Sequence, residues 1–454
     1  MPAPNIILIN CDDLGYGDLG CYGSELHSTP HIDRMAAEGM RFTDFYMPAS
    51  VCSPSRGGML TGCYPPRVGF GWFENRWVLL PGHPVGLNPE EITVARLLQG
   101  AGYDTKLVGK WHCGDQEPFL PTEHGFDSYY GLPYSNDMGR QRPPKDFQAP
   151  PLPLMRDTEV VQEQPDQAGL TERYVEEAVR FLRQPRANPF FLYFAHMYVH
   201  GPRFVPPVFQ KRSRNGNYGA AVECIDWATG AILDELERQG LAENTLVIFT
   251  SDNGSGRPES NAPLRGRKGT TWEGGMRLPC IMRWPGRINA GSVCNALTSA
   301  MDFYPTLSAV GGADVPDDRV IDGHDIRSLM FGESEESPYE AFFYYMSNRL
   351  EAVRKDNWKL HVGKKFGNEY RDIRELYDLD NDPGESNNLY DDRPEIVAEL
   401  SELLQRCRQD IGDEATGIEG ENVRPVGRVS DPDTLTHHDP DHPYIIEEYD
   451  LNDQ

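Results

Sequence analysis

The sequence predicts an α/β protein: a large, mostly parallel β-sheet sandwiched by helices, followed by a smaller α+β unit. Apolar runs without polar alternation lie at 5–10, 103–109, 189–195 and 245–250, as expected for strands buried on both faces. Amphipathic helical segments lie between these runs, a pattern that favours a parallel sheet covered by helices. Beyond about residue 335 the pattern changes to short, closely spaced strands.

The elements follow from these patterns. Amphipathic helices are expected at 172–183 and 218–239, and Gly240 after the second is a residue type that favours helix C-caps. The smaller unit is expected to contain strands at 341–347, 350–354 and 358–362, a strand and turn in 375–385, and a helix at 394–409. We expect a catalytic α/β domain over 1–334 and an antiparallel-sheet-plus-helix subdomain over 335–454, whose acidic tail after residue 412 runs irregularly over the surface.

The composition excludes some classes of function. The 454 residues carry a net charge of −27, from 43 basic and 70 acidic residues, so no basic field gathers phosphates and we expect no nucleic-acid partner. No run of about 20 apolar residues indicates a membrane span. No basic-then-apolar leader is seen, so the chain as written is expected in the cytoplasm, or in the periplasm or medium if a leader was removed. The nine cysteines have irregular spacing without a CxxC pair, which indicates mostly reduced thiols.

Polar clusters follow each of the four buried strands. In parallel sheets, ligands bind beyond the carboxyl ends of the strands, so clusters far apart in sequence are expected to meet at one site. The clusters are Cys11-Asp12-Asp13, Lys110-Trp111-His112, His196 with His200, and Ser251-Asp252-Asn253-Gly254.

The first and last clusters supply oxygen ligands. Asp12, Asp13, Asp252 and Asn253 offer carboxylate and amide oxygens, a set that suits a hard cation, calcium first and magnesium second. The alternative for either pair alone is a solvated turn at the end of a strand. Two such pairs on neighbouring strands favour a metal site.

Three basic residues lie in polar, glycine-containing segments. Arg56, Lys110 and Lys268 occur in SPSRG, VGKWH and RGRKGTTWEGG. Each alone is compatible with a solvated surface cation, but together with a metal ion they would neutralise a tetrahedral oxyanion such as sulfate or phosphate. Pro54 favours a helix start that places Cys52 beside free backbone N–H groups.

Two long segments resemble the signatures of the type I, formylglycine-dependent sulfatases. They are CSPSRGGMLTG at 52–62 and GYDTKLVGKWH at 102–112. The resemblance continues through DDLGYGDLG, HMYVHGP, SDNG and GRKGTTWEGG, over about the first 330 residues. The stretch GLPYSNDMG at 131–139 is similar to the arylsulfatase A and N-acetylgalactosamine-6-sulfatase branch. The resemblance implies an alkaline phosphatase-like fold and hydrolysis of a sulfate monoester, on a sulfated small molecule or glycan.

The resemblance also implies roles for individual residues. Cys52 would be oxidised to formylglycine by a partner, a formylglycine-generating or anaerobic sulfatase-maturing enzyme. A hydroxyl of the hydrated aldehyde would attack sulfur, His200 or Lys268 would protonate the leaving alcohol, and His112 would accept a proton as sulfate is released. Calcium would bind Asp12, Asp13, Asp252, Asn253 and residue 52, and the sulfate would be surrounded by Arg56, Lys110, His112, Ser135, His200 and Lys268.

Two alternatives remain open. The first is a phosphodiesterase or phosphonate monoester hydrolase of the same superfamily, and the second is a catalytically silent glycan-binding protein with Cys52 unconverted. Contacts to a sugar are expected from Trp72, Phe73, Arg76 and Trp77 in GFGWFENRW, for which core packing is the alternative. Weaker candidates are Asn136, Asp137, Asn348 and Arg349.

Overall fold

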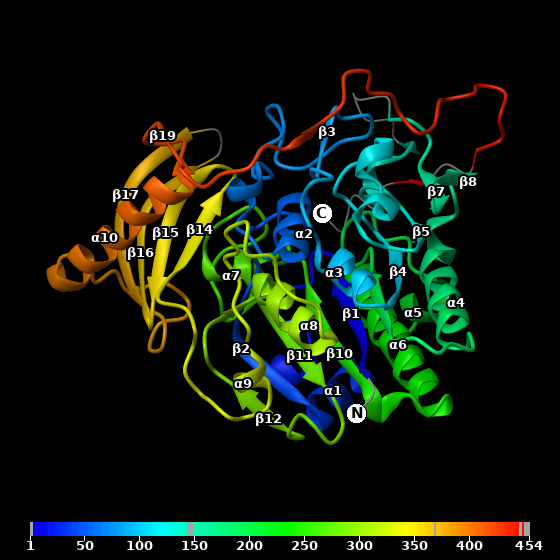
Figure 1. Cartoon of the computed structure of the whole chain (residues 1–454), viewed down its shortest axis with the longest axis horizontal. Helices are drawn as coiled ribbons and strands as arrows, with labels where there is room; N and C mark the ends of the chain where they lie inside the picture. Colours follow the sequence, from blue (N-terminus) through cyan, green and yellow to red (C-terminus); the bar gives the residue numbers. More distant parts are fainter. Residues whose placement is uncertain (1–2, 143–148, 367–368, 445–446, 449–454) are drawn as a thin grey trace.

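The computed structural model describes residues 3–142, 149–366, 369–444 and 447–448. A large sheet lies between two layers of helices, and a smaller sheet packs beside it (Figure 1). The order of the large sheet is β12-β2-β11-β10-β1-β9-β4-β5-β7-β8, with β13 beside β2. Its strands are β1 (Asn5–Cys11), β2 (Met40–Tyr46), β4 (Asp104–Gly109), β5 (Ser128–Gly131), β7 (Pro153–Arg156), β8 (Glu159–Glu163), β9 (Phe190–Ala195), β10 (Thr245–Ser251), β11 (Arg277–Arg283), β12 (Ser292–Cys294) and β13 (Thr298–Ser299).

The centre of this sheet is parallel. The four predicted apolar runs form β1, β4, β9 and β10, which lie side by side with β5 in parallel pairs. Every residue of β1, β9 and β10 is buried, because helices cover both faces. Towards the edges, β11, β7 and β8 pair antiparallel with their neighbours. The whole sheet is therefore mixed, with a parallel centre.

Each face of the sheet has its own hydrophobic core. Successive β1 side chains point to opposite faces: Ile7 and Ile9 pack in the core under α1, α4 and α6, whereas Ile6 and Leu8 pack in the core under α2, α3 and α8. The two predicted helices are confirmed as α4 and α6. The helices are α1 (Pro30–Glu38), α2 (Cys52–Thr61), α3 (Val94–Gly100), α4 (Leu170–Leu182), α5 (Pro207–Gln210), α6 (Gly216–Arg238), α7 (Glu273–Met276), α8 (Phe303–Gly311) and α9 (Arg327–Met330).

The smaller sheet is antiparallel and follows the chain order β14-β15-β16-β17. It confirms the strands predicted after residue 335, and α10 covers it, as expected for the 394–409 segment. Asp356, in the turn between β15 and β16, has φ 53°. The elements are β14 (Phe342–Met346), β15 (Arg349–Lys355), β16 (Trp358–Phe366), β17 (Glu369–Asp378) and α10 (Pro394–Asp410).

A buried charged cluster joins the two sheets. Lys359 Nζ on β16 lies 2.8 Å from Glu273 of α7 and 3.0 Å from Glu385, and all three side chains are 0% exposed. Burial opposes the charge of Glu273, but Lys359, Arg277 and Arg354 together outweigh this effect and the pKa of Glu273 is lowered. Removing one partner of such a pair leaves an uncompensated buried charge, at a cost of about 3–5 kcal/mol. The smaller sheet is therefore held in one position against the larger.

The C-terminal tail returns to the large domain. It crosses from the smaller sheet over the top of the molecule in Figure 1, and β20 (Gly427–Arg428) pairs with β3 (Val85–Gly86). Arg424 lies 2.6 Å from Glu91, so part of the tail expected with the second subdomain is anchored on the first. The boundary at 334/335 stays a prediction. The other short strands are β6 (Gln141–Arg142), β18 (Gly412–Asp413), β19 (Ile418–Glu419) and β21 (Glu447–Glu448).

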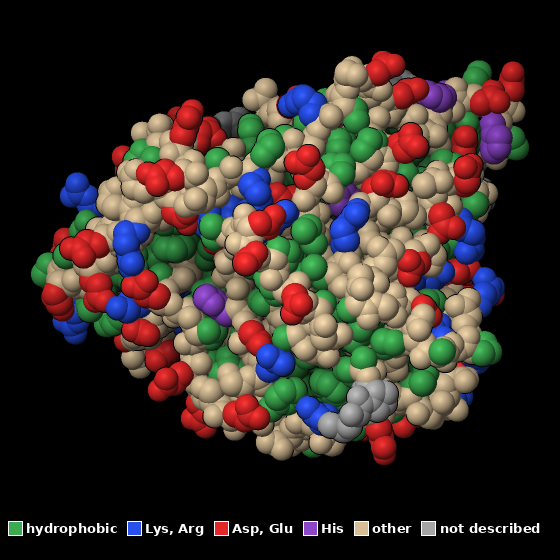
Figure 2. Space-filling model, in the orientation of Figure 1, with side chains coloured by type: hydrophobic (Ala, Val, Ile, Leu, Met, Phe, Trp, Pro, Cys, Tyr) green, Lys and Arg blue, Asp and Glu red, His purple; other side chains and the backbone are tan. Residues whose placement is uncertain are grey.

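The surface agrees with the acidic composition. Figure 2 shows Asp and Glu side chains spread over the visible face among fewer Lys and Arg. Within the described ranges, no helix combines the length and the apolar character needed to span a bilayer. All nine cysteines belong to the described residues and are unpaired.

Candidate active site

The predicted polar clusters meet at one end of the parallel strands. The register places Cys11 opposite Ser251 and Gly109 opposite Ala195, so the residues that follow these strands emerge side by side. One ligand atom from each of Asp12, Asp13, Cys52 and His200 lies within 4.8 Å of the others. This is the convergence that the parallel topology predicts.

Cys52 is the first residue of α2 and is 2% exposed. Its Sγ lies 3.5 Å from Asp12 Oδ1 and 3.4 Å from Lys268 Nζ. Burial and the charge of Asp12 raise the pKa of the Cys52 thiol, so an unmodified thiol at this position stays protonated. The glycines after Arg56 let α2 pack closely, since a Cβ at Gly57 would lie 2.4 Å from the Phe70 ring.

Three carboxylates and three cations pair one to one at the strand ends. Lys110 contacts Asp12. Lys268 lies 2.7 Å from Asp13, and Arg56 contacts Asp252 at 2.8 Å through both Nε and Nη2.

These pairings set the protonation of the two fully buried carboxylates. Burial opposes the charge of Asp12, but Lys110 and the other cations outweigh it and lower its pKa. Burial and the charge of Asp12 raise the pKa of Asp252 to about 6. The negative charge of Asp12 is therefore stabilised by the nearby cations, whereas the same charge on Asp12 makes Asp252 easier to protonate.

The oxygen set suits a hard divalent cation. Asn253 donates through Nδ2 to Asp13 Oδ1 at 2.7 Å. Asn253 Oδ1 is buried and has no hydrogen-bond partner among the described residues. An orphaned buried carbonyl oxygen beside Asp12, Asp13 and Asp252 is what a site for calcium or magnesium offers.

His112 is held in one tautomer. Its Nε2 lies 3.0 Å from the carbonyl oxygen of Leu79, and a carbonyl only accepts, so Nε2 carries the proton. Burial and Lys110 lower the pKa of His112 well below its usual value. Its Nδ1 is buried and has no partner among the described residues, which leaves a free lone pair beside Lys110.

His200 lies at the open edge of the site, with 15% of its side chain exposed. Its Nδ1 donates to the Gly201 carbonyl at 2.5 Å and lies 3.4 Å from Ser135 Oγ. Its Nε2 lies 3.9 Å from Asp13. Burial and Lys268 lower the pKa of His200, and a nearby anion would oppose that effect.

The backbone is strained where these side chains leave the sheet. Asp13 and His112 each have φ 62°, which is uncommon for residues other than glycine. Gly109 has φ 111°, and a Cβ there would lie 1.9 Å from the carbonyl oxygen of Ala195. Glycine is therefore required immediately before Lys110, because only glycine lets β4 turn Lys110 and His112 into the site.

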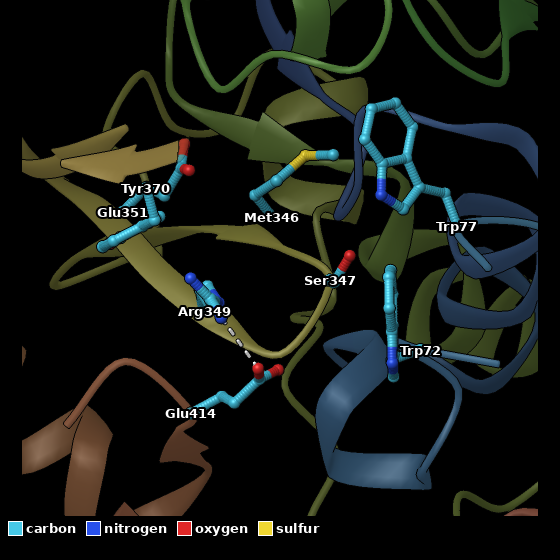
Figure 3. Close-up of a pocket in the computed structure, with 8 residues that line it drawn as sticks. All are labelled: Trp72, Trp77, Met346, Ser347, Arg349, Glu351, Tyr370 and Glu414. Atoms are coloured by element: carbon cyan, nitrogen blue, oxygen red, sulfur yellow. Dashed lines mark hydrogen bonds and ion pairs between the residues drawn. The ribbon is translucent and has the colours of Figure 1, made fainter. Parts of the chain in front are cut away.

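The candidate sugar contacts divide into two groups. Trp72, Trp77 and Arg349 line a cavity between the 72–77 loop and the smaller sheet (Figure 3). Phe73 is 0% exposed and packs edge-on against Phe70 at 4.8 Å, so the core-packing alternative holds for it. The remaining candidates, Arg76, Asn136, Asp137 and Asn348, do not line this cavity, and Asn136 is buried, donating to Gln167 and to the carbonyl of Pro202.

Five further residues of this cavity wall carry no recognisable signal in the sequence. They come from the smaller sheet and the loop after α10, and are Met346, Ser347, Glu351, Tyr370 and Glu414. No local motif marks them, since a strand sequence does not show which side chains a distant loop will face. Ser347, at the tip of the β14–β15 hairpin, has φ 58°.

Carboxylates, cations, a cysteine and a histidine therefore meet at the strand ends, and similarity to known proteins identifies the family. The family model described as "Sulfatase" matches residues 4–313, and "N-sulphoglucosamine sulphohydrolase, C-terminal" matches 267–410. The chain belongs to the sulfatase family, whose members are sulfuric ester hydrolases. The second match spans the expected domain boundary.

Named relatives cover most of the chain. Human arylsulfatase A is 39% identical over 449 residues, which cover 89% of this chain and 86% of that protein. Pig N-acetylgalactosamine-6-sulfatase is 41% identical over 400 residues, 83% of this chain and 74% of that protein. The predicted resemblance to this branch is confirmed.

Solved structures agree on the fold. The PsFucS1 sulfatase from Pseudoalteromonas sp. superposes with a TM-score of 0.79 at 28% identity, covering 89% of each chain. Phosphonate monoester hydrolase of Agrobacterium radiobacter superposes with a TM-score of 0.66 at 21% identity, covering 89% of this chain and 95% of that one. The second likeness concerns the fold alone.

We expect Gly109→Ala to disable the site. The new Cβ would require a shift of the backbone before Lys110, so stability should fall by about 1–3 kcal/mol and activity should fall with it. Gly100→Ala is the matched control, because no atom lies within 4 Å of a Cβ there. It should be neutral or slightly stabilising in urea unfolding. Equal behaviour of the two variants would show that the turn at Gly109 does not position the site.

Proposed function

We propose that this sulfatase hydrolyses the sulfate monoester of a carbohydrate, using formylglycine formed from Cys52 and a calcium ion held by Asp12, Asp13, Asp252 and Asn253. The observation that carries the proposal is the meeting of Cys52, His200 and two carboxylates within 4.8 Å, surrounded by three buried or half-buried cations. Once formed at residue 52, hydrated formylglycine would supply the nucleophilic hydroxyl, and a bound calcium ion would supply positive charge for that hydroxyl and for the sulfate oxygens.

The cations bind and orient the sulfate. Lys268 reaches both Asp13 and Cys52 Sγ, so it lies between the metal ligands and the position of the nucleophile. Lys110 and Arg56 are 0% exposed, and fixed charges in a buried site stabilise a developing oxyanion more than they would in water. Ser135, 1% exposed and beside His200, adds a hydroxyl at the same edge.

The two histidines are suited to different proton transfers. His112 is neutral with a free Nδ1, so it can accept a proton inside the site. His200 already donates through Nδ1 to Gly201, so proton donation from Nε2 requires the doubly protonated ring. The negative charge of a bound sulfate ester favours that form, and the partial exposure of His200 places it where the alcohol leaves.

The phosphonate monoester hydrolase alternative shares this fold. The family models and the relatives at about 40% identity favour sulfate instead. The silent glycan-binding alternative has no support from the site, since ligand atoms of Asp12, Asp13, Cys52 and His200 lie within 4.8 Å of one another.

The first test compares sulfate with phosphate. Protein produced with a maturation enzyme should hydrolyse 4-nitrophenyl sulfate well above 4-nitrophenyl phosphate, and Cys52→Ala should lose activity on the order of 1,000-fold or more. Cys224→Ala, another buried cysteine, is the control and should retain turnover. Peptide mass spectrometry should find an aldehyde at residue 52. A thiol alone in fully active protein, or a preference for phosphate, would refute the proposal.

The second test separates the proton donor from a sulfate-binding group. A sugar alkoxide needs a proton to leave, whereas nitrophenolate hardly does. His200→Ala should therefore lower kcat/KM for a sugar sulfate by about 100- to 10,000-fold, with a much smaller loss for 4-nitrophenyl sulfate. An equal loss on both substrates would assign His200 to sulfate binding and transfer the acid role to Lys268.

A further inference from the structure

A small cavity lies between the loop at 72–77 and the smaller sheet. Its volume is about 130 Å³, below the roughly 300–1,000 Å³ of sites for drug-sized ligands. Figure 3 shows Trp72 and Trp77 along one side, and Arg349, Glu351 and Tyr370 on the other. A cavity of this size suits one ring of a ligand better than several fused or linked rings.

Both walls of the cavity reach the sulfate site. On one side, Met346 Sδ lies 3.6 Å from the hydroxyl of Ser50, two residues before Cys52. On the other, a Cβ at Gly269 would lie 3.5 Å from Trp77 Cζ3, and Gly269 directly follows Lys268. The backbone of Ser50 accepts from Gly269 N at 2.8 Å, which joins the two walls. The cavity is therefore placed where the alcohol part of a sulfate ester would lie.

The charged groups that line the cavity are already paired, and Lys364 Nζ lies 3.7 Å from Glu351. Arg349 and Glu351 lie on the same strand, β15, and Glu414 lies beside Arg349. Arg349 Nη2 already lies 2.9 Å from Glu414 Oε1, and its guanidinium lies 4.8 Å from the centre of the Tyr370 ring. An anion entering the cavity would have to compete with Glu414 for this cation.

Glu351 adds a polar group at the wall. Its side chain is 2% exposed, and one carboxylate oxygen accepts from Thr271 at 2.5 Å. The other oxygen has no hydrogen-bond partner among the described residues. A buried acceptor without a partner is costly unless a ligand donates to it, and a sugar hydroxyl is such a donor.

We propose that this cavity binds the sugar that carries the sulfate, and that it selects one uncharged ring. This inference rests on the proposed sulfatase function. The indoles of Trp72 and Trp77 offer apolar faces to the C–H side of the ring, and Glu351 accepts from a hydroxyl. Arg349 is paired with Glu414 and Lys364 with Glu351, so a second sulfate or a carboxylate on the same ring would have to displace one of these carboxylates.

The test uses the ratio of kcat/KM for a methyl hexopyranoside monosulfate over the same sugar with a second sulfate. The wild-type ratio should be about tenfold or more. Glu414→Gln frees Arg349 to bind a second sulfate, so it should lower this ratio about two- to five-fold. Arg349→Gln removes that cation and should raise the ratio by a similar factor. A factor of about two to five corresponds to the free energy of an exposed charge pair. Glu340→Gln, which removes a charge from the exposed pair with Arg406, is the matched control and should leave the ratio unchanged.

A binding measurement tests the cavity without turnover. Saturation-transfer NMR with the unsulfated methyl hexopyranoside should detect binding to the wild-type protein, and Trp77→Ala should weaken it about tenfold or more. Equal binding to both proteins, or a wild-type preference for the disulfate, would overturn the inference. If the wild-type protein did not hydrolyse 4-nitrophenyl sulfate at all, the proposed function would be contradicted. The NMR result would still show whether the cavity binds the sugar.

Discussion

The structure depends on neutralising the negative charge of three carboxylates at the ends of buried strands with nearby cationic side chains. Asp12, Asp13 and Asp252 are held almost entirely away from water, and each is paired with at least one of Lys110, Lys268 and Arg56. Buried charges are tolerated only when they are paired and hydrogen-bonded. The set is neutral as it stands, so a bound divalent cation would leave two positive charges, and a sulfate ester would then reduce that excess. The site is therefore suited to holding a metal ion and an anion together.

The fold supplies this balance from segments that are far apart in sequence. Parallel pairing brings β1, β4, β9 and β10 to the same edge. Positive φ angles at Asp13, Gly109 and His112 turn the side chains of Asp13, Lys110 and His112 into the site. The buried Lys359 cluster then fixes the smaller sheet beside α2. The wall that faces the sulfate site is therefore as well positioned as the site itself, although it comes from a different sheet.

The sequence could predict the central strands and their polar ends because both leave local signals. Continuous apolar runs mark strands buried on both faces, and their carboxyl ends must meet in a parallel sheet. The edge strands β7, β8 and β12 were missed, because they are short and only partly apolar. Phe73 and Trp77 lie in one motif, yet one is core and the other lines the cavity. Glu351 and Tyr370 could not be assigned, since the docking of the second sheet decides what they face.

The most direct test of this charge balance is a calorimetric titration of the metal-free protein with calcium, with and without inorganic sulfate. Because the metal and the anion compensate one another's charge, each should raise the affinity for the other. We predict binding of one calcium ion that sulfate tightens about fivefold or more, and loss of this coupling in Lys268→Met. Calcium binding that is indifferent to sulfate, or stoichiometric zinc in active protein, would contradict the account.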